Sequence, residues 1–212
     1  HNKSISKIFL GFVLLFFNFN CLNLNIYMPH FAMFFLVIGI WQIKNINNSL
    51  KRAYFFGLLQ CFYLTVNIIL FFMNINLPFP FSILFTGIKL TNLVFIVYNL
   101  FKGFQIIAFN LKLKNLAKKL DLCFLLYFFM ILLSILTILI PEMALIDLIF
   151  ILFIDVYIIF YLYKFDHETI NKINEKNTDK KFWFLTFINL FIFILLCVIV
   201  VFIAKTPVSK LY

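Results

Sequence analysis

Two acidic residues and one basic residue lie inside long apolar stretches, where ionisable side chains are costly. Asp147 and Asp155 belong to the apolar run Pro141–Tyr163, and Lys89 lies in the run Phe81–Phe101. A charge at the centre of a bilayer costs about 2.5–3.5 kcal/mol on insertion scales, so it must face a partner, a water-filled cavity or the helix end. Such residues commonly mark ion or proton pathways. These three residues are therefore our candidate intramembrane charge cluster.

The spacing of the three residues allows an ion pair. On a helix, Asp147 and Asp155 lie within roughly 80° of each other and about 12 Å apart along the axis. If both runs enter the membrane from the same side, Lys89 lies about 12 Å deep, at a height between the two aspartates. The sequence leaves two interpretations open: a structural pair that joins the two helices, which we favour, or part of a transport pathway. For Asp147, a position near the outer interface is a further alternative.

Several uncharged polar residues could widen such a site. They are Gln60, Thr65, Asn67, Thr86, Thr91, Asn92, Ser134 and Thr137. Hydrogen bonds between helices would also explain them, at roughly 0.6 kcal/mol each.

The composition requires a lipid environment for these residues. Of the 212 residues, 65% are hydrophobic and 12% are charged, and the mean hydropathy is +1.07. Soluble domains have roughly 25% charged residues. The apolar runs are long and unbroken rather than alternating, which indicates helices and not a β-barrel.

The sequence predicts an all-α, polytopic transmembrane helix bundle that forms one domain over residues 1–212. We expect about seven spans, at 8–24, 27–43, 53–73, 81–101, 122–140, 143–163 and 182–204. The first follows Lys3 and Lys7 and lacks a small-residue cleavage site, so we interpret it as an uncleaved span. Because Gly and Ala are scarce, we expect helix contacts to depend on Phe, Leu and Ile rather than on small residues.

The basic residues fall into alternate connections between the predicted spans. The basic connections are 44–52, 102–121 and 164–181. With Lys3 and Lys7, fifteen of the eighteen Lys and Arg residues lie on one side, Lys205 and Lys210 lie on the other, and Lys89 is inside. By the positive-inside rule, the N-terminus and the three basic connections are cytoplasmic.

The connection 102–121 has two interpretations. Its apolar residues recur at three- and four-residue spacing with lysines between them. That pattern suits an amphipathic helix on the anionic inner leaflet. Equally, the fourth span could continue into the cytoplasm as one helix.

No catalytic or cofactor motif is found. The chain lacks a Walker loop, GxGxxG, HExxH and GxSxG, so we expect neither an enzyme nor a cofactor. Cys21, Cys61, Cys123 and Cys197 occur singly, which predicts buried apolar side chains and no metal site. The net charge of +10 is spread over short connections, so we expect no nucleic-acid partner.

The first 57 residues carry pieces of a known pattern. These pieces are Lys7–Gly11 (KIFLG), Ile26–Pro29 (IYMP), Ile38–Ile40 (IGI) and Lys51–Ala53 (KRA). They resemble a group of small uncharacterised multi-pass membrane proteins of Gram-positive bacteria. The chain departs from that pattern at His30, where the group has Asp, and at Met33 and Phe34, where it has Gly-Tyr. The resemblance implies a bacterial plasma-membrane protein and no particular mechanism.

Two functional hypotheses follow. In the first, the chain is a non-enzymatic membrane component that acts through protein or lipid partners, namely the lipid bilayer and a membrane-protein partner or a second copy of itself. In the second, it is a small transporter or ion-coupled carrier that uses Asp155, Asp147 and Lys89.

Overall fold

Six helices follow one another along the described part of the chain. The computed structural model describes residues 3–16, 24–73, 78–140, 142 and 144–169. The helices are α1 (Lys3–Phe16), α2 (Leu24–Ile43), α3 (Asn48–Phe72), α4 (Phe79–Asn110), α5 (Lys114–Leu139) and α6 (Ala144–Thr169). These ranges contain no strand, which confirms the all-α class for this part of the chain.

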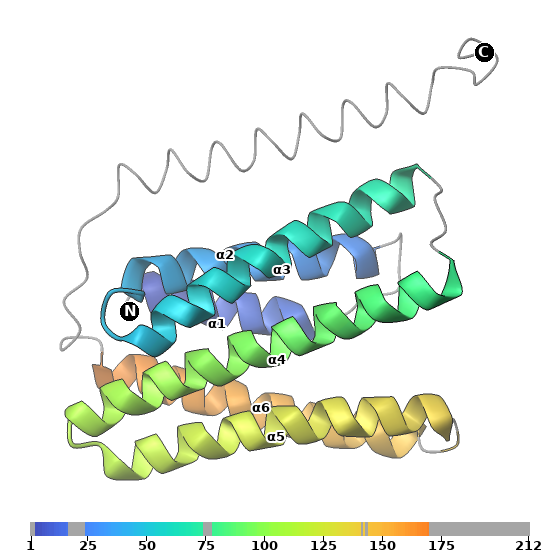
Figure 1. The fold of residues 1–212 in the computed structure, drawn as a ribbon. Helices are drawn as coiled ribbons and strands as arrows, with labels where there is room; N and C mark the ends of the chain where they lie inside the picture. Colours follow the sequence, from blue (N-terminus) through green and yellow to red (C-terminus); the bar gives the residue numbers. More distant parts are fainter. Residues whose placement is uncertain (1–2, 17–23, 74–77, 141, 143, 170–212) are drawn as a thin grey trace.

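The helices form a ring in which each packs against the next in sequence, and α6 returns to α1. In Figure 1 the ring appears as two layers, with α3, α4 and α5 in front and α2, α1 and α6 behind. The sequence order is therefore also the order around the ring.

Four of the six helices are long and apolar enough to cross a membrane. They are α3 and the greater parts of α4, α5 and α6. Over the same residues the sequence predicted six spans, whereas only four of the described helices are long and apolar enough to cross a membrane. α1 has 14 residues, and such a helix is about 21 Å long, shorter than the ~30 Å hydrocarbon core. α2 has 20 residues, and its apolar stretch with described side chains is Met28–Ile43. The predicted span 182–204 lies outside the described residues.

The segment 102–121 consists of two helix ends and a tight turn. α4 continues to Asn110 and α5 already begins at Lys114, so the structure follows the alternative of a continuous fourth helix. A Schellman motif ends α4: Leu113 N donates to Ala108 O (2.8 Å) and Lys112 N donates to Phe109 O (3.0 Å). Lys112 adopts φ 62°, the left-handed conformation usually taken by glycine.

Glycines allow α1 and α2 to pack closely, contrary to the expectation from composition. A Cβ on Gly39 would lie 2.6 Å from Ser4 O and 2.9 Å from Ile8 N of α1. A Cβ on Gly11 would lie 2.8 Å from Ala32 O of α2. The two backbones can approach this closely only because both positions lack a side chain.

The core is concentrated around the C-terminal half of α4. Phe101 packs against Phe12 of α1 with ring centroids 5.8 Å apart, and Phe104 stacks on Phe165 of α6 at 4.6 Å. These four phenylalanines are among the largest fully buried side chains. In contrast, most side chains of α4 from Phe81 to Thr91 are exposed.

We predict that Gly39→Ala destabilises the bundle by about 1–3 kcal/mol, because the added methyl group would overlap backbone atoms of α1 that cannot move aside cheaply. Thermal unfolding in detergent micelles would measure the loss. Gly87→Ala is the matched control, because a Cβ there meets no atom within 4 Å. Equal unfolding temperatures for the two variants would contradict the close packing of α1 and α2.

Candidate functional site

Lys89 lies on the sparsely packed N-terminal half of α4. Its side chain is half-buried. It forms no hydrogen bond or ion pair with any residue that the structure describes. Packing is also sparse at Gly87 nearby, where an added Cβ would meet no atom within 4 Å.

Asp147 lies in the first turn of α6 and bonds to α5. It is 8% exposed, and its Oδ2 accepts a hydrogen bond of 2.8 Å from Thr137 Oγ1. The partial positive charge at a helix N-terminus also favours a carboxylate there. Asp147 therefore joins α6 to α5 by a hydrogen bond, although its Oδ1 has no partner among the described residues.

Asp155 is the more unusual carboxyl group. It is 7% exposed, and its Oδ1 is buried without a hydrogen-bond partner among the described residues. Tyr127 of α5, itself buried, lies close enough to interact with it electrostatically. Asp155 is therefore buried near Tyr127 of α5, without the hydrogen bond to α5 that Asp147 makes.

The structure does not join the candidate cluster by ion pairs. Lys89 pairs with neither Asp147 nor Asp155. Lys164 and Glu168, both described, form an ion pair at the surface of α6 at 3.8 Å. The two aspartates of α6 lie beside residues of α5, whereas Lys89 belongs to α4. The ion pair that would join α4 to α6 is thus not formed here.

A different polar pair joins α3 to α4. Asn92 Nδ2 donates to Gln60 Oε1 (2.9 Å) and to Phe56 O (3.1 Å). Gln60 is 2% exposed and Asn92 is 7% exposed. Both residues were among the uncharged polar residues predicted to widen the candidate charge cluster or to bond between helices, and the hydrogen bond between helices is confirmed. Thr65 and Thr91 instead donate to carbonyl groups of their own helices.

Sequence reasoning missed the role of Asn47. Its Oδ1 accepts a hydrogen bond from Leu50 N (2.9 Å), which caps α3. Its Nδ2 donates to Gly103 O of α4 (3.0 Å). One side chain thus starts α3 and ties it to α4. The available signal was an Asn just before an apolar run, a common N-cap position.

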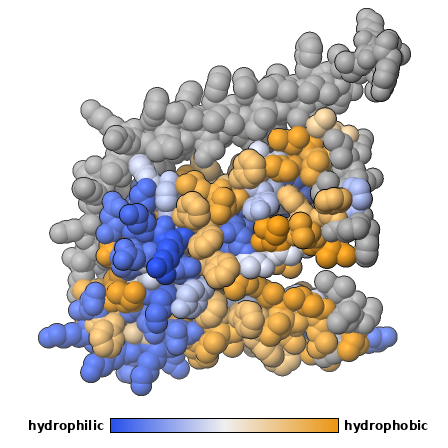
Figure 2. Space-filling model, viewed as in Figure 1, coloured by the Kyte–Doolittle hydropathy of each residue, from blue (hydrophilic) through white to orange (hydrophobic). Residues whose placement is uncertain are grey.

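The hydrophilic side chains gather at one end of the bundle. Figure 2 shows them at the left, where Figure 1 places the start of α3 and the α4–α5 turn. Lys44 illustrates how this end is held: its Nζ lies 4.0 Å from the ring centroid of Tyr54 and 5.9 Å from that of Trp41. Partial burial and the nearby charge of Lys51 lower the pKa of Lys44. Lys7 Nζ donates to Gln42 Oε1 at 3.2 Å, which joins α1 to α2 here.

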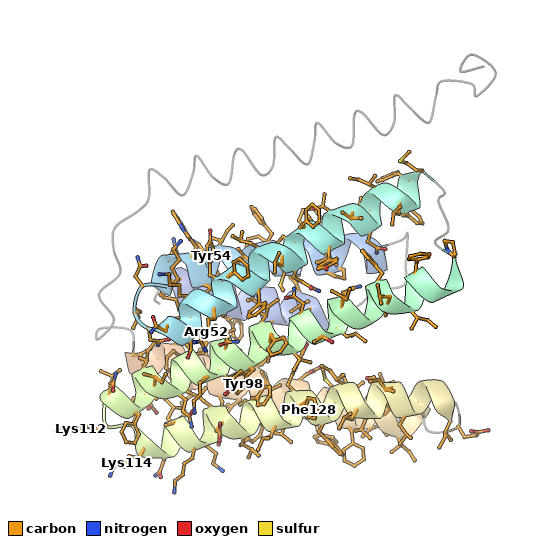
Figure 3. All side chains as sticks on the ribbon, viewed as in Figure 1. Arg52, Tyr54, Tyr98, Lys112, Lys114 and Phe128 are labelled. Atoms are coloured by element: carbon orange, nitrogen blue, oxygen red, sulfur yellow. The ribbon has the colours of Figure 1, made fainter. Side chains whose placement is uncertain are left out.

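Two grooves open at this end. The α3–α4 groove, of about 700 Å³, is lined by Asn48, Lys51, Arg52, Phe55, Phe56, Phe95, Tyr98 and Asn99. The α4–α5 groove, of about 410 Å³, is lined by Lys102, Gln105, Ile106, Phe109, Asn110, Lys114, Ala117 and Lys118. Neither is lined by Lys89, Asp147 or Asp155. Figure 3 labels Arg52 and Tyr98, on the facing helices of the first groove.

Other reactive groups are few in the described ranges. No group of three or more His, Cys, Asp or Glu residues there could hold a metal ion. Cys123 is buried, Cys61 is half-buried, and both are free thiols; Cys21 and Cys197 lie outside the described residues.

Comparison with known protein families, curated proteins and solved structures found no match to this chain. The resemblance to Gram-positive membrane proteins therefore stays a prediction.

We predict a coupling free energy of about 0.6–1.7 kcal/mol between Gln60 and Asn92, the range found for hydrogen bonds between membrane helices. A double-mutant cycle with Gln60→Leu and Asn92→Leu, read by unfolding in mixed micelles, would measure it. Thr91→Val is a suitable control for Asn92, because Thr91 bonds only within α4. Additive effects of the two substitutions would contradict a direct bond.

Proposed function

We propose that the chain is a multi-pass protein of a bacterial plasma membrane, with seven spans and a cytoplasmic N-terminus. Four helices of sufficient length and apolarity support the membrane location. The hydrophilic end of the bundle (Figure 2) carries Lys51, Arg52 and Lys114, and it supports the orientation because basic ends face the cytoplasm. In this proposal α1 and α2 cross as a closely packed short pair, and 182–204 is the seventh span.

Within this membrane, the chain acts as a non-enzymatic component through protein or lipid partners. The observation that carries this proposal is the position of the two grooves, which open at the basic end and lack the intramembrane charges. The outer face of α6 is also strongly apolar, with Phe153 72% exposed and Val156 67% exposed. Such surfaces suit contact with lipid or with another membrane helix.

A topology experiment tests the orientation. In a cysteine-free background, Lys112→Cys in the α4–α5 turn should react with a membrane-impermeant maleimide only after the cytoplasmic side is opened. Glu142→Cys, between α5 and α6, is the matched control and should react in intact cells. Both positions are exposed. Labelling of the two from the same side, or in the reverse order, would overturn the topology.

Native mass measurement after mild solubilisation tests the partner role. We expect the chain to carry a second subunit or retained lipid, because its exposed grooves and apolar faces suit such partners. A lipid-free monomer that is stable over the whole detergent range would refute this expectation.

The carrier hypothesis is the second candidate, and one observation favours it. Asp155 is buried, and its Oδ1 has no hydrogen-bond partner among the described residues. Such a group is costly inside a membrane, and ionisable residues there commonly serve ion or proton pathways.

If the chain is a carrier, proton or cation flux into liposomes should be abolished by Asp155→Asn and kept by Glu168→Gln, a surface control. The component hypothesis predicts that wild-type protein gives no flux above protein-free liposomes.

A further inference from the structure

The α3–α4 groove combines positive charge with an aromatic wall. From α3 it receives residues at helical spacing, namely Asn48, Lys51, Arg52, Phe55 and Phe56, and from α4 it receives Phe95, Tyr98 and Asn99. No acidic residue lines it, so its two cations are not neutralised from within the groove. Its volume of about 700 Å³ is within the range of small-molecule sites, roughly 300–1,000 Å³.

Polarity changes along the groove in one direction. Lys51 and Arg52 lie in the first turns of α3, at the basic end, whereas Phe55 and Phe56 lie one turn further along the helix. On α4, which runs the opposite way, Phe95 lies one turn further from the basic end than Asn99. The groove is therefore cationic where it opens at the basic end of the bundle and aromatic toward the middle of the bundle.

The aromatic part is held in place by ring packing. Phe56 and Phe95 stack across the two helices with centroids 5.3 Å apart and an interplanar angle of 17°. Tyr98 packs edge-on against Phe124 of α5 at 5.1 Å. Phe55 is 58% exposed, so the groove still presents an open apolar side chain. Arg52 and Tyr98 face the same side of the bundle in Figure 3.

We propose that the α3–α4 groove binds an anionic phospholipid, with the phosphate at Lys51 and Arg52 and the upper part of an acyl chain along Phe55 and Phe95. An amphiphile with a negative head matches both the charge and the direction of the polarity change. This inference rests on the proposed function only in placing the basic end at a membrane interface. The predicted span 182–204 is a poorer occupant, because it contains no Asp or Glu to pair with the two cations.

A lipid titration followed by native mass spectrometry of the full chain in detergent tests the site. Phosphatidylglycerol should bind wild-type protein more tightly than phosphatidylcholine. The double variant Lys51→Gln/Arg52→Gln should bind phosphatidylglycerol on the order of 30-fold more weakly, because each Lys or Arg near an anionic surface contributes a factor of about five. The double variant Lys112→Gln/Lys119→Gln removes the same charge from exposed positions outside both grooves and should bind as wild type does.

Two outcomes of this titration would overturn the proposal. One is equal affinity of wild-type protein for the two lipids, and the other is an equal loss in both double variants, which would indicate attraction to the basic end as a whole. The α4–α5 groove keeps Lys102, Lys114 and Lys118 in every variant, so any lipid held there contributes equally. The topology experiment is independent, so a correct orientation without lipid preference would reject this inference alone.

A photo-crosslinking amino acid placed at Phe55 identifies the occupant. In vesicles that contain both lipids, we expect it to crosslink phosphatidylglycerol preferentially. The same probe at Phe62, which is 65% exposed and outside the groove, should crosslink both lipids in proportion to their abundance. Crosslinking from Phe55 to residues 170–212, or to another protein, would show a different occupant and overturn the proposal.

Discussion

The confinement of positive charge to one end of the bundle is the constraint on which the remaining structure depends. A lysine at the middle of a membrane helix costs several kcal/mol, and the described helices almost entirely avoid that cost. Lys89 is the exception among the basic residues, and it lies where α4 is least packed. The two aspartates are accommodated differently, because α5 supplies Thr137 and Tyr127 beside them. The half of α4 at the charged end is close-packed, whereas the half that carries Lys89 is mostly exposed.

The features that sequence reasoning predicted are those that depend on local composition. Long apolar runs identify helices of membrane length, and this holds for α3, α4, α5 and α6. Gln60 and Asn92 could be singled out as polar residues inside apolar runs, because such residues usually bond between helices. The ends of α4 and α5 were harder to place, since lysines are compatible with both a helix that leaves the membrane and a surface loop.

The features that could not be predicted depend on which helix lies beside which. Gly39 is an ordinary glycine in the sequence, and only the position of α1 shows that a methyl group there would meet Ser4 O. Asn47 reaches Gly103 across 56 residues of sequence, so its second bond is invisible to any local pattern. An ion pair of Lys89 with an aspartate was predicted as possible from depth alone, and depth does not specify neighbours.

The ring order has a consequence for how the chain assembles. Contacts between consecutive helices have short sequence separation and close quickly, which favours rapid and stepwise folding during synthesis. α2 can dock on α1, and α3 on α2, as each leaves the ribosome. The α6–α1 contact is different, because it joins the two ends of the described chain. Until α6 arrives, Phe104 of α4 lacks its stacking partner Phe165, and α1 lacks its contact with α6. Among the described helices, closure of the ring is therefore the last step and the one most open to competition from other membrane helices.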